Sequence, residues 1–185
     1  MIETKRLILR EFNENDAYTL FEILSDKDVN KFLPMFPLKN IEEAKDIIKG
    51  YQEDNGIHYA ICFKDDNICI GYVEVSGDES HDFGYGLKKD YWHQGIVSEA
   101  ALGVIEALKN KGIPYITATH DINNPHSGDV MKKIGMTYKY SYEELWQPKN
   151  FLVTFRMYQY NFHVDDDFVY DKYWNIYENH FIEDI

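Results

Sequence analysis

The chain has 185 residues, of which 44% are hydrophobic, and its 19 basic and 32 acidic residues give a formal net charge of −13. This length and apolar content allow one domain with a sizeable core and exclude an intrinsically disordered chain. The acidic balance argues against a nucleic-acid partner, because phosphate binding needs a basic face; it mildly favours cationic or neutral small partners, although acidity also aids solubility.

The cysteines and the lack of long apolar runs indicate the cellular location. Cys62 and Cys69 sit in apolar strand-like segments, which is typical of buried thiols in a reducing compartment. Glu3, Lys5 and Arg6 interrupt any signal-peptide pattern, and no stretch approaches the ~20 apolar residues that a membrane span needs. We therefore expect a cytoplasmic protein without membrane contact.

The N-terminal part of the chain predicts one strand and two helices. Residues 5–12 (KRLILREF) are rich in branched apolar residues and predict a strand. Asn15 or Asp16 then caps a first helix. A proline-punctuated loop over 32–37 follows, and Asn40 begins a second helix with a capping-box pattern.

Three strands follow, over 58–63, 68–75 and 81–89. Residues 65–67 (Asp-Asp-Asn) give a hairpin signal between the first two. The third strand leads into the stretch DYWHQGIVSEA, in which Gly95 stands just before a helical pattern.

The next part of the chain completes a strand–helix–strand unit. The segment 115–120 predicts a strand, and we expect a parallel crossover. Asn124 and Pro125 begin a short helix that ends at Gly135, and two last strands flank the turn 146–150 (WQPKN). The order predicts an α+β fold, a mixed and mostly antiparallel sheet flanked by helices.

The C-terminal residues differ in composition, so we divide the chain into a domain over 1–161 and an extension over 162–185. The extension is acidic, yet its aromatic residues recur at helical spacing: Tyr170, Tyr173, Trp174, Tyr177 and Phe181. The pattern predicts an extra C-terminal amphipathic helix. Its aromatic stripe could roof a cleft, pack on the sheet or join a homodimer.

The glycine turn before the long helix has two interpretations. It is a plain loop-to-helix turn, or it is a cradle in which a phosphate meets free N–H groups at the positive end of the helix dipole. The chain has neither the P-loop pattern nor the GxGxxG spacing of a dinucleotide site. The glycine alone does not decide between the two.

Three motifs together resemble the Gcn5-related N-acetyltransferase (GNAT) superfamily, in particular its ribosomal-protein-alanine acetyltransferase branch. They are TKRLILR near the N-terminus, YWHQGIVSEA at the glycine turn and NPHSGDVMKKIGM in the short helix. The resemblance covers residues 1–160 and implies a GNAT fold. It also implies direct acetyl transfer from acetyl-CoA to a primary amine, either a protein N-terminal residue or a small amine.

The resemblance implies donor contacts along the turn and in the short helix. The main chain of the turn would bind the pyrophosphate of acetyl-CoA, and a strand amide, a helix-cap side chain and a lysine would complete the site: Leu87, Gln94, Gly95, Ile96, Val97, Ser98, Asn124, Ser127 and Lys133. Two positions depart from the family pattern. His93 replaces a usual glycine, and Val97 adds bulk where alanine or glycine is usual.

Acetyl transfer needs a neutral amine, a stabilised oxyanion and a proton for the departing thiolate. By resemblance Ser127 faces the thiol, although it could equally be a helix serine without a task. His120 and Glu143 are candidate general bases, with Glu74 and Glu144 as further carboxylates, and the sequence does not choose among them.

Acceptor specificity is expected in the less patterned loops, with Phe36 and Trp146 as candidate contacts. The seven histidines are scattered without the close spacing of metal ligands, so we expect no metal. The absence of an assignable base keeps one alternative open, a non-catalytic acyl-CoA-binding or regulatory module.

Overall fold

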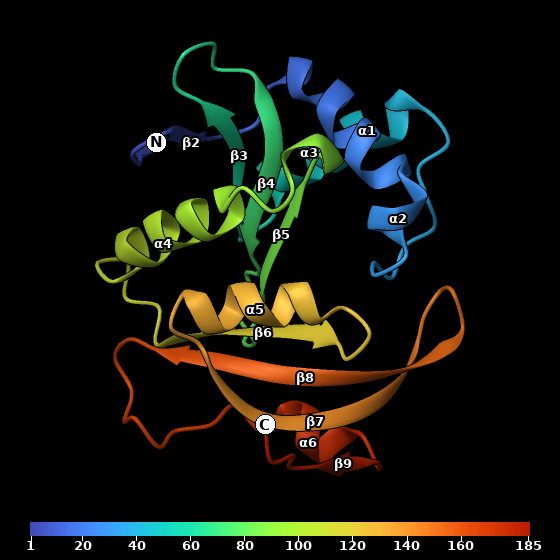
Figure 1. The fold of residues 1–185 in the computed structure, drawn as a ribbon, viewed down its shortest axis with the longest axis vertical. Helices are drawn as coiled ribbons and strands as arrows, with labels where there is room; N and C mark the ends of the chain where they lie inside the picture. Colours follow the sequence, from blue (N-terminus) through green and yellow to red (C-terminus); the bar gives the residue numbers. More distant parts are fainter.

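Two sheets form the centre of the molecule, which the computed structural model describes over residues 1–185 (Figure 1). The first contains β1 (Ile2–Glu3), β2 (Leu7–Arg10), β3 (Ile57–Phe63), β4 (Cys69–Val75) and β5 (Phe83–Leu87), which lie in chain order. The second has the order β6 (Tyr115–Asp121), β8 (Phe151–Asn161), β7 (Thr137–Trp146) and β9 (His180–Phe181). Neighbouring strands within each sheet are antiparallel.

The two sheets meet where β5 and β6 begin. A single parallel bridge joins Asp82 to Thr117, and no further pairing connects the two strands. The expected parallel crossover is therefore present, but it is reduced to one bridge. Beyond this bridge β5 and β6 belong to different sheets, and the edge of β5 that faces away from β4 stays unpaired.

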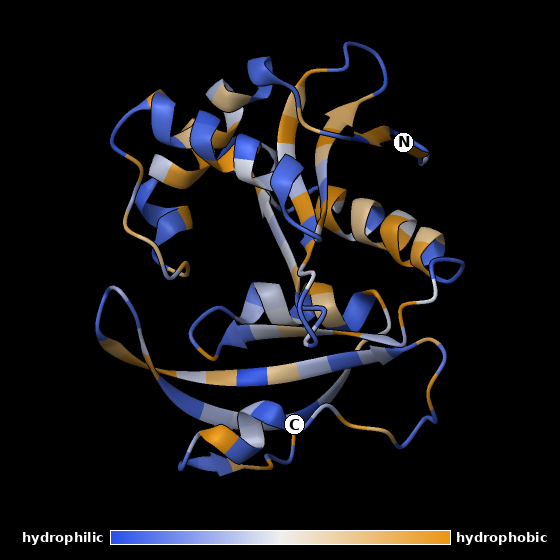
Figure 2. Cartoon of the chain, turned by 180° about the vertical axis from the view of Figure 1, so that it is seen from behind, coloured by the Kyte–Doolittle hydropathy of each residue, from blue (hydrophilic) through white to orange (hydrophobic).

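Helices cover both faces of the first sheet, as expected for the α+β fold. The face with Ala60 and Tyr72 packs on α1 (Ala17–Ser25) and α3 (Ile41–Glu53), and the short α2 (Lys27–Asn30) follows α1. The opposite face packs on α4 (Ile96–Leu108), and α5 (Pro125–Lys133) packs on the second sheet. Figure 2 shows that α4 is coloured largely as hydrophobic, and its buried residues belong to the main core. The short 3-10 turns η1 (Glu14–Asp16) and η2 (Lys89–Tyr91) complete the helical part.

The first helix begins at the predicted place, because Asp16 occupies the N-cap position of α1, but its side chain makes no capping hydrogen bond there. The capping hydrogen bonds come one turn earlier: the Asn13 side chain accepts from the Asn15 N–H at 3.0 Å, and Asp16 accepts from the Asn13 N–H at 2.8 Å. This capping box forms the 3-10 turn η1, from which α1 continues. The second helix begins as predicted, with Asn40 accepting from the Glu43 N–H at 3.2 Å.

The prediction of an extra C-terminal amphipathic helix is mostly wrong. The segment forms only α6 (Lys172–Ile176) and then the edge strand β9, which pairs with β7. Its aromatic residues pack on the second sheet: Tyr142 stacks on Tyr173 and Tyr177 with ring centroids 5.1 and 4.8 Å apart. The helical spacing was misleading because these aromatic residues pack on an aromatic face of β7 and β8, which a short helix and a strand cover as well as one long helix would.

Both cysteines are buried and free, as predicted for structural thiols. No helix combines the length and the apolar character that spanning a membrane requires.

Candidate functional site

The turn that begins α4 is left-handed at two residues and open in front. Gly95, at the N-cap position, has a φ of 70°, and His93 has a φ of 60°. No side chain caps the helix, so the first N–H groups of α4 are free at the positive end of its dipole. A Cβ atom on Gly95 would meet one neighbour, Lys133 Nζ at 3.9 Å. The turn thus has the donors, the space and the nearby cation that an anionic group needs.

The side chains that follow this turn are buried or half-buried, so the open space in front of Gly95 is bordered mainly by main-chain groups. Ile96 and Ser98 are 1% and 5% exposed, and Val97 packs half-buried against the main core. The bulk of Val97 is therefore accommodated by the core. Gln94 is fixed by its carbonyl, which accepts from Arg6 Nη2 at 3.1 Å.

The edge of β5 that faces away from β4 is free on the side where the two sheets diverge. The Lys88 N–H bonds the Ile70 carbonyl of β4 at 2.9 Å. Because amides alternate in direction along a strand, Leu87 directs its N–H away from β4 and toward the opening. The Leu87 carbonyl accepts from Trp92 Nε1 at 2.9 Å. β5 thus offers the Leu87 amide to an extended ligand.

Two glycines let side chains of β4 reach over β5. A Cβ on Gly84 would lie 2.9 Å from Glu74 Oε1, and a Cβ on Gly86 would lie 2.4 Å from Tyr72 Cε1. Any other residue at these positions would push the two side chains away. Glu74 and Tyr72 therefore extend toward the free edge of β5, on the face opposite α4.

A second carboxylate lies on this same face. Asp82 immediately precedes β5 and lies two residues before Gly84, so both share one face of the strand. The buried Oδ1 of Asp82 has no hydrogen-bond partner. Burial, followed by the negative charges of Glu74 and Asp78, raises the pKa of Asp82 to about 7. A carboxyl group whose pKa lies near neutral pH is suited to general base chemistry, and Glu74 places a second carboxylate on the same face.

Ser127 is the sequence-predicted residue with the most specific contact. Its Oγ lies 2.8 Å from Tyr85 Oη, which also donates to the Ser127 carbonyl at 2.9 Å. This contact joins β5 to α5 across the gap between the sheets. Asn124 occupies the N-cap position of α5, but its side chain makes no capping hydrogen bond and is half-buried. The amide of Asn124 is therefore available to a ligand.

The candidate bases His120 and Glu143 lie elsewhere. His120 is 4% exposed beneath α5, where a Cβ on Gly128 would come within 2.5 Å of its Nε2, and burial lowers its pKa. Glu143 accepts from Asn179 Nδ2 at 2.9 Å at the edge covered by the C-terminal segment. Burial raises the pKa of Glu144, whose partner is Tyr177. The structure brings none of the three beside Glu74 and Asp82.

The two loops expected to border the acceptor are connected. Lys149, in the turn between β7 and β8, donates to the Asn30 carbonyl, to Asn30 Oδ1 and to the Leu33 carbonyl at 2.5, 2.8 and 2.8 Å. Figure 1 shows this turn rising toward the end of α2. Phe36 is 59% exposed on the first loop, whereas Trp146 packs edge-on against Phe155 at 5.0 Å.

Comparison with known proteins decides the family. The acetyltransferase (GNAT) domain family matches residues 6–137 of the chain. The chain belongs to the GNAT acetyltransferase family. It is 32% identical to the uncharacterized N-acetyltransferase YnaD of Bacillus subtilis over 139 residues, which cover 73% of this chain and 81% of YnaD. A second relative, YoaA of the same organism, is 28% identical over 144 residues, with the same shares of the two chains covered.

Solved GNAT structures share the fold. A GNAT-family acetyltransferase from Bacillus anthracis superposes with a TM-score of 0.79 at 23% identity and covers 88% of this chain and 99% of its own. RimL, a ribosomal L7/L12 alpha-N-protein acetyltransferase in complex with coenzyme A, gives a TM-score of 0.73 at 20% identity and covers 88% and 97%. The family and the relatives identify this GNAT protein as an acetyl-CoA-dependent N-acetyltransferase.

Three residues of this GNAT site were missed from the sequence: Tyr85, Asp82 and Lys149. A signal for two of them exists in the stretch HDFGYGL. Alternation places Asp82 with both glycines on one face of the strand and Tyr85 on the other. Nothing in the sequence indicates that Lys149 meets residues more than a hundred positions away.

Proposed function

We propose that the open turn at Gly95 binds the diphosphate of acetyl-CoA. The observation that carries this proposal is the left-handed, uncapped turn with free space in front of it and Lys133 Nζ beside it. The pantetheine arm would then follow the free edge of β5, where Leu87 offers its amide. Asn124 would bind the arm through its uncommitted side-chain amide.

The same geometry supports a direct transfer. An ammonium has no lone pair, so the pair of Asp82 and Glu74 first takes one proton from the acceptor. The amine nitrogen then bonds to the thioester carbonyl carbon while the Leu87 N–H donates to the carbonyl oxygen, and the C–S bond breaks. The second nitrogen proton reaches the thiolate through Ser127, whose hydroxyl Tyr85 holds. Ammonium and acetyl-CoA become an amide, the thiol of coenzyme A and one released proton.

The acceptor is proposed to be a primary amine, either a protein N-terminal residue or a small amine. A site with two carboxylates attracts a protonated amine, and the net charge of −13 acts in the same direction. An N-terminal α-amine is the acceptor class named for the similar L7/L12 enzyme. A panel of N-terminal peptides and small amines, assayed for release of coenzyme A, separates the two classes.

Donor binding is tested by calorimetric titration with acetyl-CoA. Gly95→Glu should abolish binding, because a carboxylate would occupy the turn. Gly112→Glu is the matched control: Gly112 also has a positive φ, 73°, and open surroundings, but it lies at the far end of α4. Equal affinity of the two variants would refute the cradle.

The catalytic roles are tested by kinetics. Ser127→Ala should lower kcat by tenfold or more with nearly unchanged acetyl-CoA affinity; a parallel loss of both would assign Ser127 to binding only. Asp82→Asn should lower kcat/KM by a factor on the order of 100, the usual contribution of a general base. A variant with wild-type activity would remove Asp82 from the mechanism.

A further inference from the structure

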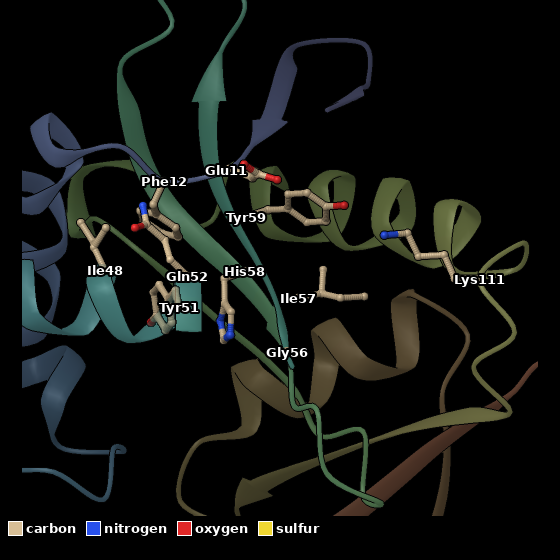
Figure 3. A pocket seen from close by; sticks show the side chains of 10 residues that line it. All are labelled: Glu11, Phe12, Ile48, Tyr51, Gln52, Gly56, Ile57, His58, Tyr59 and Lys111. Atoms are coloured by element: carbon tan, nitrogen blue, oxygen red, sulfur yellow. The ribbon is translucent and has the colours of Figure 1, made fainter. Parts of the chain in front are cut away.

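A pocket lies at the free edge of β3, between the end of α3 and the segment that follows α4. Its volume is about 330 Å³, and Figure 3 shows His58 and Tyr51 lining it close together, with Glu11 and Lys111 farther along the wall. It opens where β2 has ended: β3 pairs with β2 only over 60–63, so residues 57–59 have a free edge. This opening is distinct from the gap between β5 and β6.

His58 connects this pocket to the carboxylates of the proposed acceptor site. Its Nε2 lies 2.9 Å from both carboxylate oxygens of Asp54, at the end of α3. Its Nδ1 is buried without a hydrogen-bond partner and faces Glu74 Oε2 at 3.6 Å. Tyr51 stacks on the ring at 4.0 Å and 13°. Asp54 and Tyr51 thus fix the imidazole ring in an orientation in which Nδ1 faces Glu74.

The groups form a continuous series from the site to solvent. Asp82 and Glu74 share one face of the first sheet, close enough for the charge of Glu74 to act on Asp82. His58 is the register partner of Glu74 on β3, and Asp54 has a side chain that is 50% exposed. Burial acts to lower the pKa of His58, but the carboxylates of Glu74 and Asp54 outweigh it, so its pKa is raised. The charged neighbours of His58 are therefore Asp54 from α3 and Glu74 from β4; Tyr51 is the uncharged titratable group on its other side.

We propose that His58, held by Asp54, passes the acceptor's proton from the Glu74–Asp82 pair to solvent through the pocket at the free edge of β3. The proposal rests on the proposed function, in which each turnover releases one proton at this pair. With donor and acceptor both bound, the carboxylates are covered from the side of the gap. The pocket provides a second route: the neutral imidazole takes the proton at Nδ1, which faces Glu74. The imidazolium formed in this way stabilises the negative charge left on the pair until its Nε2 proton leaves to solvent.

The test is the pH dependence of kcat/KM for the His58→Gln variant. Glutamine keeps hydrogen-bonding groups but carries no charge. The acid limb of the profile should move up by about one pH unit, because an opposite charge within about 4–6 Å shifts the pKa of a carboxylate by that order. At pH 6.5 activity should fall roughly tenfold, and above pH 9 it should approach that of the wild type. Acetyl-CoA affinity should not change.

Two further variants make the result decisive. Asp54→Asn should shift the limb in the same direction by less, because it weakens the charge on His58 while changing an exposed side chain; it also serves if His58→Gln does not fold. Glu11→Gln, in the same pocket without a contact to His58, should leave the profile unchanged.

A loss of activity by one factor at every pH would make His58 a structural residue and overturn the proposal, as would unchanged profiles of both variants. A wild-type protein without acetyl transfer in the amine panel, or an Asp82→Asn variant with wild-type activity, refutes the proposed function, and with it the proton route.

Discussion

Replacing Gly86 with alanine should destabilise the protein by about 1–3 kcal/mol, the cost of overpacking a well-packed core. A Cβ there would lie 2.4 Å from Tyr72 Cε1, whereas ordinary contacts begin at 3.4 Å, so the ring must move by about 1 Å. Tyr72 is 6% exposed and packs in the core beneath α1 and α3, where it has no space to retreat. This overpacking cost outweighs the stabilisation of roughly 0.4–1 kcal/mol that a Gly→Ala change gives by lowering the entropy of the unfolded chain.

Urea unfolding followed by circular dichroism measures this change. Gly50→Ala in α3 is the matched control: nothing lies within 4 Å of the added methyl group, so it should stabilise the protein by about 0.5–1 kcal/mol. In a Tyr72→Ala background, Gly86→Ala should cost almost nothing. The reasoning is refuted if Gly86→Ala stabilises the protein as Gly50→Ala does, or if its cost persists without the ring.

Three other changes have outcomes that the contacts predict. Lys149→Met should lower the free energy of unfolding by about 1–3 kcal/mol, because it leaves oxygens of the buried Asn30 unpaired, and should raise the acceptor KM; Lys5→Met, at an exposed position, should do neither. Glu183→Gln should cost about 1 kcal/mol at neutral pH. Hydrogen bonding to Arg156 lowers the pKa of Glu183, so this stability is present above the ordinary glutamate pKa and disappears as the pH falls through the folded value, which unfolding at pH 7 and pH 3 would show. Deleting residues 168–185 should give a protein that binds a hydrophobic dye, since it uncovers the aromatic face of β7 and β8; an unchanged melting curve without dye binding would contradict this.

Local signals predicted most of the fold. Asn40 and Pro125 begin helices at the predicted places, and the strands 58–63, 68–75 and 115–120 lie within one or two residues of their prediction. These features depend on caps, proline and alternation, which act over a few residues. The family resemblance then connected them into one architecture.

The site was less predictable, because its chemistry arises between distant segments. Glu74 could be named as a carboxylate, but its reach over β5 depends on Gly84 in another strand. Asp82 acquires its raised pKa from burial that only the meeting of the two sheets produces. His120 had a suitable pKa as a residue type, yet packing beneath α5 removes it from the carboxylate pair.

The C-terminal segment also determines when the aromatic face of β7 and β8 becomes covered during synthesis. The ribosome delivers α6 and β9 after β7 and β8, so Tyr140, Tyr142 and Phe155 are uncovered in the meantime. Until α6 and β9 emerge, the nascent chain presents an aromatic sheet face to chaperones and to neighbouring chains. A chain that lacks this segment therefore keeps the glycine turn of α4 but is prone to aggregate.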